Sequence, residues 1–404
     1  MKCVIINSTT KSISTGQILI GLYDWLVVKG IDTYFFYGRH DDEKNKKDKR
    51  ISRFCSRLSV MMHMLMSRLT GLQGYFSYFT TKRLIAKIKK IKPDFIVLGI
   101  LHGYYINFIT LFKFLKKHKI NTYYFLFDEY PFLGKCAFFN NCMKFKSECS
   151  RCPAVHDFPS SWFFDRSKKI FLDKKQAYSN FSELTFVGFP YTISCAKKSA
   201  VLTDFSGNFC DFGWGLSLIN SKHSNSEIFK KYNIPDNKTI ILNVGRYSNE
   251  RKGIKKYFYP IAQKLADRSD IVFVHIGLDK TNVDIPKNVI ALPFVNDQEL
   301  LLSFYSFADL LVITSDNEGL PTVCVEALAC GTPICGFKIS GIPYVAPSPF
   351  GEYIEPFNVE KMVDFISRVE KKNKKTINEC KEYAISNYSR EVVFHKIFNS
   401  YIRK

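Results

Sequence analysis

Short apolar runs rich in β-branched residues alternate along the chain with segments that repeat apolar residues at helical spacing. The first run, Cys3–Ile6, predicts a strand. The segment Gly16–Lys29 then places its large apolar residues on one face of a helix, which Gly30 ends. The next strand is expected at Thr33–Tyr37. This order of strand, helix and strand indicates a parallel sheet covered by helices on both faces.

The same order continues along the chain and weakens only between Asp128 and Lys230. Further strands are expected at Phe95–Leu98, Thr122–Phe127, Leu184–Val187, Thr239–Val244, Ile271–Ile276, Val289–Leu292, Leu310–Thr314 and Pro333–Gly336. Further helices are expected at Thr81–Ile91, Tyr104–Lys117, Ile254–Ala266, Gln298–Phe307 and Pro321–Cys330. These elements make two successive runs of the same kind.

A chain of 404 residues is too long for one compact core and suits two domains. We therefore predict an α/β protein with two doubly wound, Rossmann-like domains that face each other across a cleft. The N-terminal domain would span residues 1–215, with a Cys-rich insertion at 128–160. The C-terminal domain would span 216–404, and its last helix could pack back on the N-terminal domain. Ligands bind at the carboxyl ends of the strands in such sheets.

The composition is that of an ordinary globular protein, but the formal net charge is +21. Such a charge attracts nucleic acid, an anionic membrane surface or phosphate-bearing small molecules, or it simply keeps the protein soluble. Nucleic acid ranks last, because no RNA-recognition, zinc-finger or helix-turn-helix signature is present. No apolar run is long enough to span a bilayer, and Met1–Asn7 lacks the features of a signal peptide. We therefore expect a cytoplasmic protein.

The segment from Ser315 to Pro333 carries the clearest chemical signal. A polar loop with Glu318 follows an apolar strand, and Pro321 suits the first turn of the next helix. Glu326 lies within that apolar helix, where a carboxylate costs stability unless it has partners. Ligand hydroxyl groups are suitable partners, and the helix start offers backbone N–H groups to a phosphate.

The sequence Glu-Gly-Leu-Pro followed by Glu-Ala-Leu-Ala-Cys-Gly-Thr-Pro resembles the donor-binding motif of family-4 retaining glycosyltransferases, which have the GT-B fold. The resemblance implies that Glu318 and the loop residues Gly319 and Leu320 lie near the donor sugar. It also implies that Glu326 holds the ribose hydroxyls of a nucleotide-sugar donor.

A second match lies upstream, at Arg246 and Lys252. Asn-Val-Gly-Arg ends a strand and Glu-Arg-Lys-Gly precedes a helix, which resembles the family's paired cations on the donor diphosphate. Two cations can stabilise the charge of a departing nucleoside diphosphate without a metal. A solvated basic loop is the alternative.

The N-terminal half matches more loosely. Gly16, before the first helix, resembles a glycine turn near the diphosphate and the acceptor. The segments at 93–107 and 127–136 resemble a subgroup from O-antigen and colanic-acid gene clusters. That subgroup usually has a histidine where this chain has Phe127, and the family has a glutamate where this chain has Tyr344. His102 remains as a candidate polar group in the cleft, or as a structural histidine at a strand end.

Four cysteines lie close together in the sequence: Cys136, Cys142, Cys149 and Cys152. Four thiolates can surround Zn²⁺ tetrahedrally, and the resembled subgroup carries a similar pattern. A structural zinc site, unpaired thiols and a redox disulfide are the alternatives.

The segment from Arg50 to Lys92 contains many cationic residues interspersed with apolar ones, among them Met61, Met62 and Met64. This mixture suits peripheral contact with an anionic membrane, or a core helix with a solvated basic face. In the resembled family this domain receives the acceptor, often a polyprenyl-diphosphate-linked sugar.

The sequence therefore predicts a retaining, nucleotide-sugar-dependent glycosyltransferase of bacterial surface polysaccharide biosynthesis. Glu318, Arg246, Lys252 and His102 would be its catalytic residues, and Gly16, Gly319, Leu320 and Glu326 would complete the binding site. Transfer needs no cofactor in this family, whose members are thought to let the donor phosphate take the acceptor proton. The expected location is the cytoplasm, with contact at the inner membrane. A non-catalytic member that binds nucleotide or glycan for a partner enzyme is the alternative, and a sugar-phosphate epimerase is a weaker one.

Overall fold

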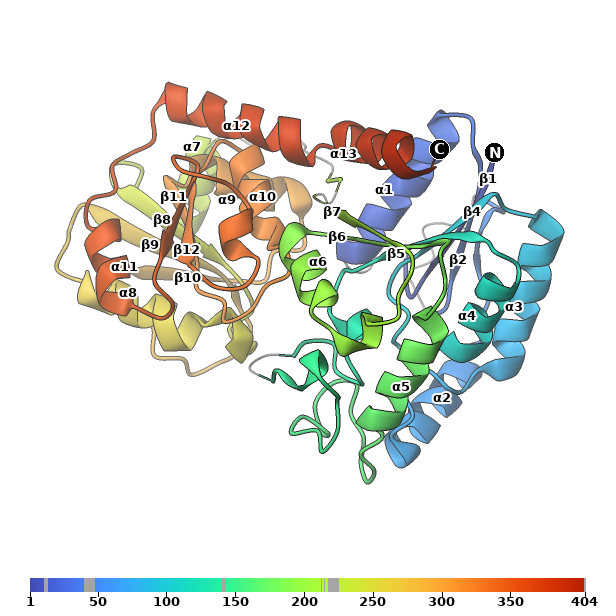
Figure 1. Cartoon of the computed structure of the whole chain (residues 1–404). Coiled ribbons are helices and arrows are strands. Elements are labelled where there is room, and N and C mark those ends of the chain that lie inside the picture. The colour runs from blue at the N-terminus through green and yellow to red at the C-terminus, as the bar shows by residue number, and fades with distance from the viewer. Residues whose placement is uncertain are drawn as a thin grey trace. The chain divides into compact units, whose positions relative to one another are not determined.

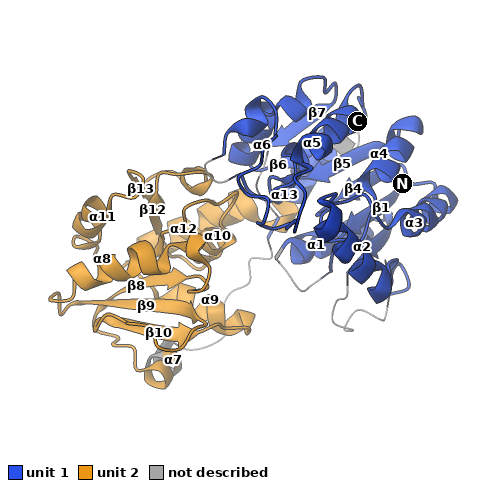
Figure 2. Cartoon of the chain, turned by 90° about the horizontal axis from the view of Figure 1, so that it is seen from below, with its two compact units in different colours: residues 1–216, 393–404 blue, residues 217–392 orange. Residues whose placement is uncertain are grey.

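The computed structural model describes residues 1–10, 14–39, 48–139, 142–211, 213, 215–216 and 225–402. The chain divides into two compact units, one of residues 1–216 with 393–404 and one of residues 217–392 (Figure 2). Each unit contains its own parallel sheet and its own hydrophobic core.

The first unit has a seven-stranded parallel sheet with the order β3-β2-β1-β4-β5-β6-β7. Its strands are β1 (Lys2–Asn7), β2 (Asp32–Tyr37), β3 (Ile51–Arg53), β4 (Phe95–Leu98), β5 (Asn121–Phe125), β6 (Leu184–Gly188) and β7 (Asn208–Asp211). Its helices are α1 (Ser14–Val28), α2 (Arg57–Thr70), α3 (Tyr78–Ile91), α4 (Phe108–Lys117), α5 (Ser167–Tyr178) and α6 (Pro190–Lys197).

Both faces of this sheet are buried, which explains why its central strands are largely apolar. Val4 and Ile6 pack into a core shared with α3, α4 and α5. Because side chains alternate along a strand, Cys3 and Ile5 point to the opposite face. The chain end returns to this unit in α13 (Arg390–Ile397), where Phe394 meets Trp25 of α1 edge to face at 6.1 Å (Figure 1).

The second unit has a six-stranded parallel sheet with the order β10-β9-β8-β11-β12-β13. Its strands are β8 (Thr239–Val244), β9 (Ile271–Leu278), β10 (Val289–Pro293), β11 (Leu310–Ile313), β12 (Ile334–Phe337) and β13 (Gly351–Ile354). Its helices are α7 (Asn225–Tyr232), α8 (Tyr259–Lys264), α9 (Gln298–Phe307), α10 (Thr322–Ala329), α11 (Val359–Ile366) and α12 (Lys374–Tyr388).

Two expected helices begin or continue differently, for local reasons. The helix expected from Tyr104 begins at Phe108, because Tyr104 has a φ of 68° and the Asn107 side chain caps the helix by accepting from the N–H of Thr110. The helix expected at 254–266 is a π-helix, Ile254–Phe258, followed by α8. Pro260 lacks the N–H that an unbroken α-helix would need there.

Strand order reverses at one point in each sheet, between β1 and β4 and between β8 and β11. The carboxyl ends of the strands beside such a switch point are the usual place for a ligand in doubly wound sheets. Among the described residues, no helix is both long and apolar enough to cross a membrane.

Candidate functional site

The switch point of the second unit holds a cluster of one carboxylate and two cations. Lys252 follows β8, and its Nζ donates to Glu318 Oε1 at 2.7 Å; Glu318 follows β11. The guanidinium of Arg251 lies 3.1 Å from Glu318 Oε2 and also donates to the carbonyl of Asn317. The Glu318 side chain is 9% exposed, whereas the Lys252 side chain is 21% exposed, so the ammonium is the more accessible partner.

Glu318 is held in its ionised form. Burial alone would raise the pKa of this carboxyl, but Lys252 and Arg251 more than offset that effect and lower the pKa below its usual range. At neutral pH the side chain is therefore an acceptor of hydrogen bonds and cannot serve as a proton donor.

The loop that carries Lys252 is fixed against the end of β11. The Thr314 hydroxyl donates to the carbonyl of Lys252 at 3.0 Å, and the N–H of Asp316 donates to the carbonyl of Arg251 at 2.8 Å. Gly253 has a φ of 68°, and a Cβ placed on it would lie 2.2 Å from the Thr314 carbonyl oxygen. Only glycine fits this close approach.

Replacing Gly253 with alanine tests this packing, with Gly30 as a matched control. Gly30 also has a positive φ, of 78°, but its added Cβ would meet no atom within 4 Å. We expect Gly30→Ala to cost about 1–2 kcal/mol of stability from backbone strain alone. Gly253→Ala should cost a further ~1–3 kcal/mol from the clash, measured as the difference in urea unfolding. Equal losses in the two variants would contradict the packing.

The Glu318 loop is also fixed from its other side, by residues after β12. The N–H of Glu318 donates to Ser340 Oγ at 2.9 Å, and the N–H of Gly341 donates to the Glu318 carbonyl at 2.8 Å. A Cβ on Gly341 would lie 1.8 Å from the carbonyl oxygen of Gly319. Gly319 and Leu320, both expected from the sequence to line the donor site, are partly exposed on this loop.

Glu326 lies on α10 and has a partner of its own. The Tyr305 hydroxyl donates to Glu326 Oε2 at 3.0 Å. Burial raises the pKa of Glu326 to about 7, and the bond from Tyr305 opposes this rise only in part. Both Glu326 and Glu318 raise the pKa of the buried Cys324 thiol beyond the effect of burial, and Lys252 lowers it. The two glutamates therefore act on the same small region of α10.

The raised pKa of Glu326 makes stability depend on pH. The folded state binds this proton more tightly than the unfolded state, so the stabilisation is present below about pH 4 and is lost as pH rises through about 7. We expect Glu326→Gln to gain on the order of 1–2 kcal/mol relative to wild type between pH 5 and pH 8. Urea unfolding of both proteins at the two pH values measures this. A difference that does not change with pH would contradict the raised pKa.

Arg246 follows β8 as well, but its partners differ from those of Lys252. Its guanidinium lies 4.4 Å from the ring centre of Phe294, and Nη1 lies 3.9 Å from Asp279 Oδ2. The side chain is 55% exposed, so it remains accessible to an anion. The neighbouring Gly245 packs against the Lys252 side chain. A Cβ placed on Gly245 would lie 3.4 Å from the Lys252 Cβ, which is an ordinary packing distance. Lys252 thus packs beside Gly245, the residue that precedes Arg246 in the turn after β8.

A buried histidine, which sequence analysis does not single out, supports the turn at Gly245. His275 is fully buried in β9, and burial lowers its pKa. Its Nε2 lies 2.9 Å from the Gly245 carbonyl oxygen, and its Nδ1 lies 2.9 Å from the Tyr259 hydroxyl. A neutral ring that donates from Nε2 and accepts at Nδ1 satisfies both contacts.

In the first unit, His102 and Asp128 meet near the ends of β4 and β5. His102 Nε2 lies 2.5 Å from Asp128 Oδ2, and the N–H of Tyr130 donates to Asp128 Oδ1 at 3.0 Å. A carboxylate only accepts, so Nε2 carries the hydrogen in the neutral ring. Nδ1 is buried and has no hydrogen-bond partner among the described residues. The rings of Tyr130 and Phe158 flank the imidazole. Sequence analysis identifies only His102 of this pair as a site candidate. Asp128 directly follows the apolar run of a predicted strand, and this position could have identified it as well.

Gly16 is buried in the first turn of α1 and packs on the chain that leaves β1. A Cβ on Gly16 would lie 2.2 Å from the carbonyl oxygen of Thr10 and 3.2 Å from Thr9 Oγ1. This close approach accounts for the glycine by itself. Contact of Gly16 with a ligand remains a prediction.

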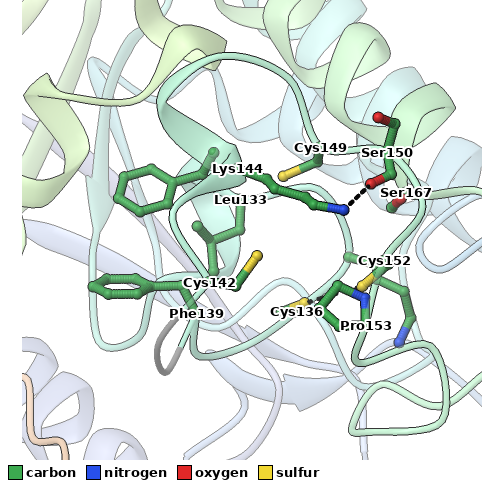
Figure 3. A pocket seen from close by; sticks show the side chains of 12 residues that line it. Leu133, Cys136, Phe139, Cys142, Lys144, Cys149, Ser150, Cys152, Pro153 and Ser167 are labelled. Carbon is green, nitrogen blue, oxygen red and sulfur yellow. Dashed lines mark hydrogen bonds between the residues drawn. The ribbon is translucent and has the colours of Figure 1, made fainter.

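The four cysteines of the insertion, for which a structural zinc site was one of three alternatives, line one pocket (Figure 3). The Sγ atoms of Cys136 and Cys152 lie 3.9 Å apart. In the described part of the chain, no three His, Cys, Asp or Glu side chains are placed to hold a metal ion. Buried lysine organises the segment instead: Lys135 Nζ donates to the carbonyls of Ala154, Val155 and Asp157 at 2.9–3.1 Å.

Comparison with known proteins identifies relatives of the second unit and of the whole chain. Residues 224–387 match the model of the glycosyl transferases group 1 family. The chain is 20% identical over 333 residues to the WcaC colanic acid biosynthesis glycosyl transferase of Escherichia coli (strain K12), and the match covers 78% of each protein. It is 29% identical over 180 residues to the TuaC teichuronic acid biosynthesis glycosyltransferase of Bacillus subtilis (strain 168), with 43% of each covered.

Solved structures share the fold over the full length. Sucrose-phosphate synthase from Thermosynechococcus elongatus has a TM-score of 0.66 at 14% identity, with 100% of this chain and 99% of that one covered. Anabaena Alr3699/HepE in complex with UDP has a TM-score of 0.65 at 13% identity, with all of both chains covered. These similarities confirm the GT-B fold class, with two parallel-sheet α/β halves. The part of the second unit from residue 224 to residue 387 is therefore similar to the glycosyl transferases group 1 family, and the chain as a whole shares the fold of these solved structures.

Proposed function

We propose that the protein transfers a sugar, with retention, from a nucleotide-sugar donor to a glycan or a polyprenyl-diphosphate-linked acceptor. The observation that carries this proposal is the Lys252–Glu318 pair at the switch point of the second sheet. A cation and an ionised carboxylate side by side suit a donor that presents a diphosphate and sugar hydroxyls together. The match of residues 224–387 to the glycosyl transferases group 1 family supports the same chemistry.

The donor diphosphate would bind Lys252 and Arg246. A phosphate oxygen can replace the Glu318 carboxylate at the accessible Lys252 ammonium, which would free Glu318 to accept from sugar hydroxyls. The exposed Arg246 guanidinium would stabilise the charge that grows on the leaving diphosphate. Glu326, on the neighbouring helix, would accept from the ribose hydroxyls.

On the acceptor side, we propose that His102 takes the place of the subgroup histidine that Phe127 replaces. Asp128 orients the ring through Nε2. Nδ1 is buried and has no hydrogen-bond partner among the described residues, and a hydroxyl of the donor sugar or of the acceptor would supply that partner. No other base is assigned to the chain. The resemblance to retaining enzymes implies that the donor phosphate receives the acceptor proton.

The biological setting is proposed from the relatives. WcaC and TuaC bear the names of colanic acid and teichuronic acid biosynthesis, which are both bacterial polysaccharides. We therefore place this chain in the synthesis of a bacterial surface polysaccharide such as an O-antigen, at the cytoplasmic face of the inner membrane.

A mass-spectrometric screen of the purified chain tests the proposal. UDP-, GDP- and dTDP-sugars are offered with an extract of lipid-linked acceptors, and free nucleoside diphosphate is measured. We expect release from one nucleotide class, at a rate that rises with the acceptor extract. Phe127 and Tyr344 favour the non-catalytic alternative, which would show nucleotide-sugar binding by thermal shift without any release.

A further inference from the structure

The first unit exposes an apolar surface that the proposed chemistry does not use. Three segments contribute large apolar side chains that are at least one-third exposed. They are Leu58, Met61, Met62, Leu65 and Met66 on α2, Tyr78 and Phe79 at the start of α3, and Trp162, Phe163 and Phe164 before α5. We call this set the α2 face. The side chains of Phe79 and Phe163 are 78% and 69% exposed, whereas phenylalanine side chains are usually buried.

Hydrogen bonds join the three segments into one surface. At the C-terminal end of α2, the N–H of Trp162 donates to the carbonyl of Arg68 at 2.7 Å, and the Arg68 guanidinium lies 5.7 Å from the Trp162 ring centre. At its other end, the hydroxyls of Ser59 and Thr80 lie 3.2 Å apart. Figure 1 shows α2 beside the start of α5, where the aromatic segment ends.

The aromatic segment is held in its exposed position by the fold. The Ser161 hydroxyl donates to the carbonyl of Phe164 at 2.8 Å. The same carbonyl approaches Gly71 so closely that a Cβ there would lie 2.2 Å from its oxygen. The backbone therefore presents three consecutive aromatic side chains outward, where a soluble surface would carry polar residues. Contiguous exposed apolar surface of this kind marks a contact with a partner or a membrane.

The charges around the α2 face select an anionic partner. Residues 49–93 contain no Asp or Glu, and the exposed cations Arg57, Lys82 and Arg83 lie on or beside α2. Arg166 adds another exposed cation, with its guanidinium 5.4 Å from the Phe164 ring centre. A second copy of the chain would bring like charges together, whereas an anionic bilayer would complement them.

We propose that the α2 face docks on an anionic lipid bilayer, with α2 lying in the plane of the interface. Tryptophan and phenylalanine settle at the boundary of headgroups and acyl chains, and cations bind the headgroups. A helix of 14 residues is too short to span the bilayer but suits this orientation. The proposal deepens the membrane part of the proposed function, because it names the surface and the lipid chemistry.

Vesicle flotation of the full chain at low salt tests the docking surface. We expect at least a tenfold larger bound fraction with vesicles containing phosphatidylglycerol than with pure phosphatidylcholine. The double variant Phe79→Ser/Phe163→Ser should lose this binding at least tenfold. Ile385→Ser, which removes a 53% exposed apolar side chain from α12, is the matched control and should bind as wild type does.

Three outcomes would overturn the proposal. The first is that the wild-type protein does not float with anionic vesicles. The second is that the control variant loses as much vesicle binding as the double variant does. The third is that light scattering without lipid shows a dimer of the wild-type protein that the double variant does not form. Nucleotide-sugar binding by thermal shift, measured without vesicles, is a separate readout. It should be unchanged in the double variant, so failed docking and a failed glycosyltransferase assignment can be told apart.

Discussion

Glu318→Gln is expected to lower the rate of sugar transfer by about 10²-fold or more while the protein remains folded. Glutamine has the same shape, so the backbone bonds from Glu318 to Ser340 and Gly341 can persist. The lost charge removes the partner of Lys252 and Arg251 and the proposed acceptor for the donor sugar. Loss of one preorganised electrostatic contact of this kind typically reduces turnover on this scale. Turnover with the active nucleotide-sugar measures it, with circular dichroism as the check of folding.

Asp316→Asn provides the matched control for Glu318→Gln. Asp316 lies two positions earlier on the same loop, and its carboxylate lies 3.9 Å from Lys256 and not beside Lys252. This variant should keep most of the wild-type rate. Undiminished turnover in Glu318→Gln, or an equal loss in both variants, would contradict the role assigned to Glu318.

Lys252→Met is expected to weaken the binding of the preferred nucleoside diphosphate by about 10- to 100-fold. A charged hydrogen bond to a phosphate contributes about 1.5–3 kcal/mol, and each 1.4 kcal/mol corresponds to about tenfold in affinity. Methionine preserves the apolar length of the side chain, so packing against Gly245 should survive. Calorimetry with UDP, GDP and dTDP measures the affinity of wild type and variant for each nucleoside diphosphate. The corresponding nucleoside has no diphosphate, so it should bind the variant and wild type equally well.

The exposed Lys255 supplies the control for this charge. It lies three positions after Lys252 and lines a different surface pocket. Lys255→Met should leave affinity for the nucleoside diphosphate within about twofold. If Lys252→Met weakened the diphosphate and the nucleoside alike, the contact would lie elsewhere on the ligand.

Much of the fold could be predicted because its central strands are buried on both faces. The strands β1, β4 and β8 each contain a run of at least three consecutive apolar residues, so the sequence predicts their positions. The sequence does not predict the edge strands β3, β7 and β13, because each has only three or four residues and lacks a continuous apolar run. These strands are Ile51–Arg53, Asn208–Asp211 and Gly351–Ile354. A strand at the edge of a sheet does not require an apolar run, because it forms by hydrogen bonding to the neighbouring strand.

The candidate site was predictable as a set of residues but not as a set of contacts. Lys252 and Glu318 were both identified, yet 66 positions separate them, and no local pattern indicates that they pair. Arg251, Ser340 and His275 act through such long-range contacts and gave no signal of their own. The same holds for the α2 face: its methionines were noted, while Trp162 joins them only through the fold.

A crystal structure of the chain with the bound nucleoside diphosphate would test the central claim most directly. We expect a phosphate oxygen at about 3 Å from Lys252 Nζ, the distance of a charged hydrogen bond, with the Lys252–Glu318 contact opened. A diphosphate bound away from the ends of β8 and β11, with Lys252 still paired to Glu318, would contradict it.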